Sequence, residues 1–126
     1  MSKKDYELGE AELSVLRALW DGGPQTVREV MLWLHQRGRK VAYTTVLTFL
    51  TRLEQKGFAA SDKREQAYVY RAKVSRENVT RSRVRSLLEQ LYDGAAAPMV
   101  LQLMESERFS TTEIEQLRKM IDELDS

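Results

Sequence analysis

The stretch that decides the fold is residues 26–57, TVREVMLWLHQRGRKVAYTTVLTFLTRLEQKG. It opens with Thr26-Val27-Arg28-Glu29, a capping box in which the threonine hydroxyl accepts from the glutamate amide and the glutamate carboxylate reaches back. Apolar residues then recur at helical spacing to about Gly38. After the basic turn Arg37-Gly38-Arg39-Lys40, a second apolar stripe ends at Lys56-Gly57, where a glycine suits the left-handed cap. That stripe consists of Val46, Leu50 and Leu53. Two short helices joined by a basic turn are predicted.

The flanking segments extend this order in both directions. Before it, a helical stripe ends firmly at Asp21-Gly22-Gly23-Pro24. That first stripe consists of Leu13, Leu16 and Trp20. After it, the period-two alternation of Tyr68-Val69-Tyr70-Arg71, preceded by the polar turn Lys63-Arg64-Glu65-Gln66, predicts a β-hairpin with a basic tip. Three helices and a hairpin make a winged helix-turn-helix, whose third helix enters the major groove of DNA.

The charge distribution agrees with that assignment. The whole chain carries a net charge of only +1, but residues 28–73 hold 10 Lys/Arg against 4 Asp/Glu, a net charge of +6. Such a block suits a polyanion, although an ordinary solvated surface explains the same count. The basic block covers the second helix, the third helix and the wing, so charge and predicted fold coincide on a DNA-binding surface.

The third helix supplies the residues expected to read the DNA sequence. Opposite its buried stripe lie Thr44, Thr45, Thr48 and Arg52. Short hydroxyls reach base edges, threonine methyls meet thymine methyls, and Arg52 can take a phosphate or a guanine. Tyr43 stands at the start of this helix, and Arg39 and Lys40 come just before it. Threonines are also common on solvated helix faces, so the spacing alone leaves that simpler explanation open.

Three further basic residues are expected to position the duplex. Arg28 lies in the first turn of the second helix, where backbone amides can also hold a phosphate. Lys63 and Arg64 at the wing tip would reach the flanking DNA backbone. For each basic residue taken singly, a solvated surface side chain is an equally good interpretation.

The remainder of the chain predicts three more helices and a dimer. Ser75 can cap a fourth helix, Pro98 can open a fifth, and Ser110-Thr111-Thr112-Glu113 is a capping box for a sixth. So small a unit buries its apolar stripes poorly alone, and a two-fold dimer solves that. We therefore expect a winged-helix DNA-binding domain over residues 1–73 and a helical dimerisation domain over residues 74–126. The residues expected at the dimer interface are Leu87, Leu88, Leu91, Met99, Val100, Leu103, Ile114, Leu117 and Ile121.

Composition argues against catalysis and against membrane insertion. The chain has no cysteine and one histidine, His35, which is expected to be an ordinary surface residue, so no metal site, cofactor or enzymatic activity is expected. No apolar run approaches the roughly 20 residues that a membrane span requires. The start, Met1-Ser2-Lys3-Lys4-Asp5-Tyr6, lacks the apolar stretch of a secretion signal. A cytoplasmic protein is expected.

Across nearly its whole length the sequence resembles the BlaI/MecI penicillinase-repressor family of winged-helix regulators. The resemblance is carried by Leu13 through Trp20, Thr26-Val27-Arg28-Glu29-Val30, Tyr43-Thr44-Thr45-Val46, Leu50 through Gly57, Tyr68-Val69-Tyr70 and Met99-Val100-Leu101. It implies a homodimer held by the C-terminal helices, in which each winged helix reads half of a palindromic operator and blocks transcription.

The same resemblance implies a route to derepression. In the family, a membrane-bound metalloprotease sensor typically leads to cleavage inside the dimerisation helices, and the matching bond here is Gln102-Leu103. The family's best-known members have asparagine and phenylalanine at these two positions. The copper-responsive branch carries C-terminal cysteines, so the absence of cysteine excludes thiolate copper sensing here.

Two other classes of function remain to be compared with a sequence-specific repressor. The basic face could instead dock an acidic protein partner, without sequence-specific DNA binding. A hydrolase or transferase with an unrecognised site is nearly excluded by composition, because no nucleophile motif and no phosphate-binding glycine loop is present.

Overall fold

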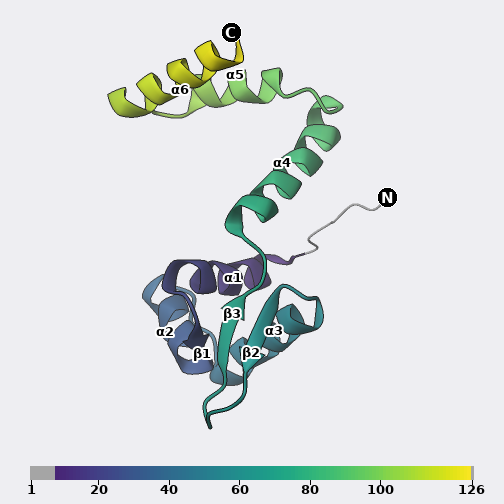
Figure 1. Ribbon diagram of the computed structural model, residues 1–126, viewed down its shortest axis with the longest axis vertical. Coiled ribbons are helices and arrows are strands. Elements are labelled where there is room, and N and C mark those ends of the chain that lie inside the picture. Colours follow the sequence, from purple (N-terminus) through teal and green to yellow (C-terminus); the bar gives the residue numbers. More distant parts are fainter. Residues whose placement is uncertain (1–7, 126) are drawn as a thin grey trace. The chain divides into compact units, whose positions relative to one another are not determined.

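The protein is mainly helical, and its computed structural model describes residues 8–125. The elements are α1 (Glu10–Gly22), β1 (Gln25–Thr26), α2 (Val27–Gln36), α3 (Tyr43–Gln55), β2 (Ala59–Asp62), β3 (Val69–Ala72), α4 (Arg76–Tyr92), α5 (Ala97–Ser106) and α6 (Thr111–Leu124) (Figure 1). This order confirms the predicted winged helix-turn-helix followed by three helices. The chain forms two compact units, which divide between Val84 and Arg85, inside α4.

The core of the N-terminal unit is built from the predicted helical stripes. Side chains of α1, α2 and α3 that are at most 2% exposed are Val15, Leu16, Ala18, Leu19, Val30, Leu34, Val46, Leu50 and Leu53. Each large apolar side chain buried in this way stabilises the fold by roughly 1.5–3 kcal/mol relative to an exposed one. Of the stripe expected in α1, Leu16 lies in the core, while Leu13 and Trp20 are partly buried against it.

The helix ends follow the local sequence signals. The Thr26 hydroxyl accepts from the Glu29 amide at 3.2 Å, and the Glu29 carboxylate accepts from the Thr26 amide at 2.9 Å. Ser110 and Glu113 repeat this capping box at the start of α6. After α3, Gly57 has a φ of 84°, which a glycine adopts without strain. The predicted caps are therefore confirmed.

The sheet contains one strand that the sequence pattern did not indicate. Its order is β1-β3-β2, all antiparallel, with Ala59 opposite Ala72 and Gln25 opposite Tyr70. β1 has two residues, which is too short to show a period-two pattern. Buried Gln25 anchors it, because its Nε2 donates to the Ala18 carbonyl at 2.7 Å. By pairing with β3, the short strand β1 connects the wing to the turn between α1 and α2.

A partly buried ion pair joins the start of α1 to the end of α3. The Lys56 ammonium lies 2.8 Å from a carboxylate oxygen of Glu12, which also accepts from the Gly9 amide at 3.2 Å. Burial raises the pKa of Glu12, but the hydrogen bonds from Lys56 and Gly9 and the positive charges of Lys56 and Arg52 together outweigh that effect, so the pKa lies below its ordinary value of 4.5. Glu12 therefore remains ionised in the folded protein at neutral pH.

The Glu12→Gln variant is expected to have a lower free energy of unfolding at neutral pH, by about 1–2 kcal/mol, because a neutral amide keeps at most a hydrogen bond to the Lys56 ammonium and loses the attraction between opposite charges. A carboxyl group whose pKa is depressed by folding contributes stability above its unfolded pKa and loses it as the pH falls through the folded value. The difference from wild type should therefore shrink below pH 4.5. Urea unfolding across this range measures it.

Glu10→Gln is the matched control, because the Glu10 side chain is 92% exposed and lies 3.9 Å from Arg39. It should unfold like the wild type at every pH. If Glu12→Gln does so as well, the ion pair of Glu12 and Lys56 does not stabilise the fold.

Candidate nucleic-acid interface

The exposed face of α3 is formed by side chains opposite its core stripe. With about 3.6 residues per turn, Thr44 and Thr48 lie nearest the middle of this face, and Thr45 and Arg52 lie towards one flank. Thr44, Thr48 and Arg52 are exposed, whereas Thr45 is half-buried. The Thr48 hydroxyl donates to the Thr44 carbonyl at 2.9 Å, which holds the side chain in place and leaves the oxygen able to accept. These four residues are three threonines and one arginine, so none of them brings a negative charge to the face.

Beside this face an open hollow of about 520 Å³ connects α2, α3 and the hairpin. It is lined by Thr26, Val27, Arg28, Tyr43, Leu47, Gln66, Ala67, Tyr68 and Tyr70. The fold thus brings together Arg28 and Tyr43, two predicted contact residues from different helices. Arg28 is exposed in the first turn of α2, where the free backbone amides add to its positive charge. A phosphate in this hollow would meet the Arg28 guanidinium, the N-terminus of α2 and the phenol of Tyr43.

The basic turn between α2 and α3 is partly organised by its own contacts. Arg37 stacks on the Trp33 ring, with 3.6 Å from its guanidinium carbon to the ring centroid. Arg39 is half-buried and lies 3.9 Å from Glu10, whereas Lys40 is exposed. Both predicted residues, Arg39 and Lys40, lie in the turn shortly before α3. Lys40 is the more accessible of these two cations.

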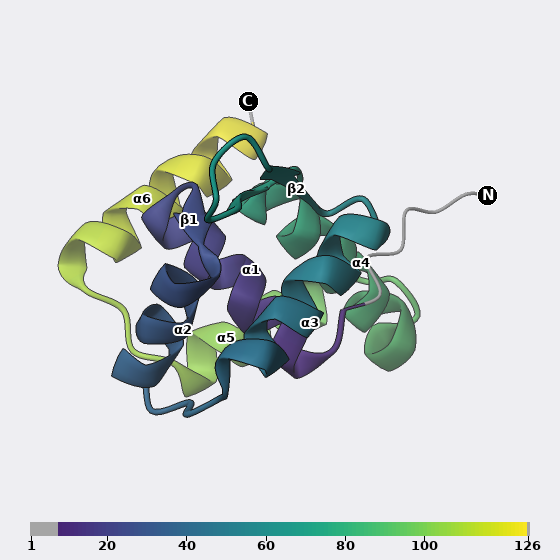
Figure 2. The same ribbon diagram turned by 90° about the horizontal axis from the view of Figure 1, so that it is seen from below.

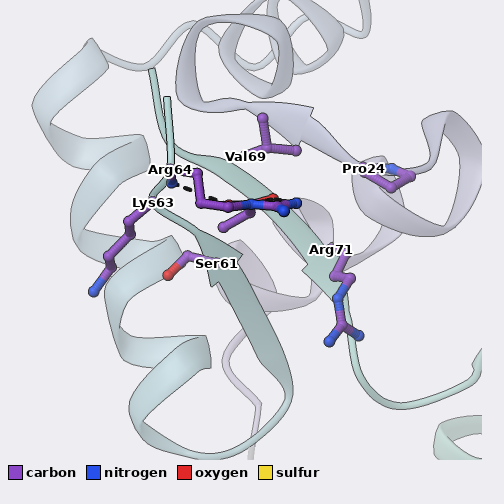
Figure 3. A pocket seen from close by; sticks show the side chains of 7 residues that line it. Pro24, Ser61, Lys63, Arg64, Val69 and Arg71 are labelled. Carbon is purple, nitrogen blue, oxygen red and sulfur yellow. Dashed lines mark hydrogen bonds and ion pairs between the residues drawn. The ribbon is translucent and has the colours of Figure 1, made fainter. Parts of the chain in front are cut away.

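The wing, formed by β2, β3 and the turn between them, projects beyond α2 and α3 (Figures 1 and 2). Arg64 forms a two-pronged pair with Asp62, with nitrogen to oxygen distances of 3.0 and 2.7 Å. Hydrogen bonds from the Arg64 side chain and amide lower the pKa of Asp62 to about 2, so this carboxylate stays charged. Figure 3 shows Arg64 lying over the hairpin and Arg71 pointing away from it. The Lys63 ammonium lies 5.6 Å from the centroid of the Tyr68 ring. Lys63 and Arg71 are both exposed.

Several side chains on this surface were not among the predicted contacts. They are Leu47, Gln66, Tyr68 and Arg71. Arg71 belongs to the basic block and Tyr68 to the predicted strand. Neither the charge count nor the strand pattern says which other helix or strand such a residue will face. Tyr68 and Tyr70 are two residues apart and share one side of the hairpin, yet Tyr70 is buried and Tyr68 is 44% exposed. The period-two pattern alone does not predict that difference. The wing contributes more to the surface than its two tip residues.

In the C-terminal unit, the apolar side chains of α5 and α6 are largely uncovered. Neither helix has a buried residue. Of the residues predicted for a dimer interface, Leu88 is buried, Met99 and Leu117 are half-buried, and the rest are exposed. The exposed ones are Leu87, Leu91, Val100, Leu103, Ile114 and Ile121. Isolated soluble chains rarely leave so many large apolar side chains in water, so this unit calls for a covering surface.

The described residues, 8–125, contain no cluster of three or more His, Asp or Glu side chains able to hold a metal. His35 is half-buried instead of lying at the surface as predicted, because its Nε2 lies 2.8 Å from the Val41 carbonyl oxygen. It closes the turn before α3. Within the same range no helix is long and apolar enough to cross a bilayer. Residues 1–6, in which the sequence shows no secretion signal, lie outside the described range.

Comparison with known proteins places these features in a family. Residues 8–123 match the family described as Penicillinase repressor. The chain is 26% identical over 124 residues to the penicillinase repressor of Staphylococcus aureus, covering 98% of both chains. It is 32% identical over 120 residues to the transcriptional regulator BlaI of Mycobacterium tuberculosis (strain CDC 1551 / Oshkosh), covering 94% of this chain and 86% of that one.

Among solved structures, the complex structure of hsRosR-S4 is similar in fold, with a TM-score of 0.53 at 12% identity. The similarity covers 80% of this chain and 89% of that one. The family match spans both compact units, and its members are repressors rather than enzymes. The chain therefore belongs to the penicillinase repressor family and is a winged-helix transcriptional repressor, not an enzyme.

Proposed function

We propose that this repressor binds a palindromic DNA operator as a homodimer, with α3 of each protomer in the major groove. The observation that carries the proposal is the exposed threonine face of α3, flanked by cations from α2, the preceding turn and the wing. The winged-helix domain of residues 1–73 reads DNA, and the helical domain of residues 74–126 pairs the protomers.

The proposed contacts divide into those that read bases and those that position the backbone. Thr44, Thr45 and Thr48 present hydroxyl and methyl groups to base edges, whose major-groove pattern differs for each base pair. The remaining predicted residues hold phosphates or the groove edge: Arg28, Arg39, Lys40, Tyr43, Arg52, Lys63 and Arg64. Phosphate contacts supply affinity and register but little sequence information.

Dimerisation makes the weak individual contacts sufficient. A single winged helix has a small footprint, whereas linking two raises the effective concentration of the second at its half-site and can strengthen binding by about 10²- to 10⁴-fold. The uncovered apolar side chains of α5 and α6 supply the pairing surface in this proposal. A two-fold dimer then matches a two-fold symmetric operator.

The test of base reading uses the Thr44→Ala and Thr48→Ala variants on a site selected by the wild type from random duplexes. Loss of a base contact is expected to cost about 1–3 kcal/mol on the selected site and little on random DNA. Filter-binding titrations at two salt concentrations measure both. Lys63→Ala should instead weaken binding to all sequences and reduce the salt slope by about one unit.

Thr80→Ala is the matched control, since Thr80 is an exposed threonine on α4. It should keep both affinity and site preference. If the α3 variants retain full site preference, or if the wild type prefers no sequence, base reading by α3 is refuted. The result would then favour a winged helix that docks an acidic protein.

The Leu117→Glu and Ile121→Glu variants test the pairing surface on α6. A carboxylate at either position would be buried without a partner in the dimer, so dissociation is expected, with a loss of operator binding of about 10²-fold or more. Sedimentation measures the mass. Gln116→Glu, at an exposed polar position of α6 that lies off the stripe of Leu117 and Ile121, is the control and should leave the dimer intact. An unchanged dimer mass for both interface variants would contradict the assignment.

Derepression by proteolysis completes the proposal. The Gln102–Leu103 bond lies within α5, and both residues are exposed in the single chain. Cutting it would separate α6 and the end of α5 from the rest of the protomer and so weaken pairing. Co-expression with a membrane-bound metalloprotease sensor encoded nearby, followed by sizing of the repressor after induction, tests this step. A chain that stays intact while repression is relieved would rule it out.

A further inference from the structure

A cluster of contacts fastens the beginning of α4 to the end of α1 within the N-terminal unit. The indole Nε1 of Trp20 donates to the Val74 carbonyl at 2.8 Å. The guanidinium of Arg76 pairs with the Asp21 carboxylate and lies over the Trp20 ring, 5.3 Å from its centroid. Val79, one turn further along α4, is 2% exposed and belongs to the core. We call these five residues the α4 anchor.

The anchor holds α4 at several points along its first turn. Val74 precedes the helix, Arg76 begins it, and Val79 lies on the side that faces the core. Contacts at separate positions restrain the direction of a helix as well as its location. In addition, α4 is one uninterrupted helix of 17 residues that begins in one compact unit and ends in the other. The anchor therefore restrains the direction of the first turns of α4 on the DNA-binding unit.

A small change in that direction is large on the scale of DNA. A helix of 17 residues is roughly 25 Å long, so a tilt of about 10° at its start moves its end by about 4 Å. Successive base pairs are about 3.4 Å apart. A paired repressor meets two half-sites at a separation set by its own geometry. Loosening the start of α4 would then change which separations the dimer accepts.

We propose that Trp20, Asp21 and Arg76 are positioning residues that determine the half-site spacing this repressor recognises. The inference rests on the proposed binding of a homodimer to a palindromic operator. None of the three lies on the α3 face or lines the hollow beside it, so they act through α4 and not by touching bases. They set specificity for operator architecture, while α3 sets specificity for sequence.

The ion pair has the properties of a positioning contact more than of a stabilising one. The side chains of Arg76 and Asp21 are 51% and 35% exposed, and exposed pairs contribute little to folding stability. Removing the Arg76 guanidinium should therefore leave the N-terminal unit folded. Trp20→Phe likewise keeps an aromatic ring and removes the N–H donor to Val74, together with part of the indole ring.

The experiment starts from palindromic sites selected by the wild-type protein from a pool of random duplexes. Operators are then made in which the spacer between half-sites is one or two base pairs shorter or longer. Dissociation constants of wild type, Arg76→Ala and Trp20→Phe are measured on each, and on a single half-site. The wild type is expected to lose about tenfold or more per base pair of altered spacing.

For the two variants we expect that loss to fall to about threefold or less, with half-site affinity and melting temperature unchanged. Arg83→Ala is the matched control, because Arg83 is exposed on the same helix and forms no ion pair in the described part of the chain. It should keep the wild-type spacing profile.

Two outcomes would overturn the positioning role, and a third would overturn the proposed operator. Spacing profiles of both variants as steep as that of the wild type overturn the positioning role. Loss of half-site binding in both variants also overturns it, because the contacts would then maintain the fold itself. Selection by the wild type that yields no paired half-sites overturns instead the palindromic operator on which this inference rests.

Discussion

The burial of one side of α3 is the constraint on which the rest of the molecule depends. Val46, Leu50 and Leu53 are fully buried against α1 and α2, so the helix cannot turn about its axis without exposing them. The opposite face, with Thr44 and Thr48, is held towards solvent by the same packing. Threonine side chains alone would not fix which side of α3 faces solvent, because they gain little from either environment. The orientation of α3 comes from the apolar half of the helix.

Electrostatics then determine how that surface meets a polyanion. Lys63, Arg28 and Lys40 are exposed on three different elements around α3. Other cations are already engaged, since Arg64 pairs with Asp62 and Arg37 stacks on Trp33. These engaged groups still contribute to the positive field, but their side chains are restrained before any ligand arrives. The basic surface therefore combines accessible cations with cations that are restrained by internal contacts.

The two compact units differ in how completely they bury their apolar residues. The N-terminal unit closes its own core around three helices and a small sheet, whereas α5 and α6 have no buried residue. The N-terminal unit thus has a hydrophobic core of its own, whereas the apolar side chains of the C-terminal helices need a covering surface. In the proposed dimer, weakening the pairing would release DNA without requiring the N-terminal unit to unfold.

Local signals in the sequence determined the elements: the capping boxes at Thr26 and Ser110, the glycine that ends α3, and the apolar spacing of each stripe all correspond to the observed helices. These features depend on residues within a turn or two of one another, so they can be predicted without the fold. Tertiary structure alone decided that Gln25 adds a third strand, that Leu47 and Tyr68 line one hollow with Arg28, and that Trp20 meets Val74. Each of these contacts joins residues whose proximity depends on how helices and strands pack, and no local pattern encodes that packing.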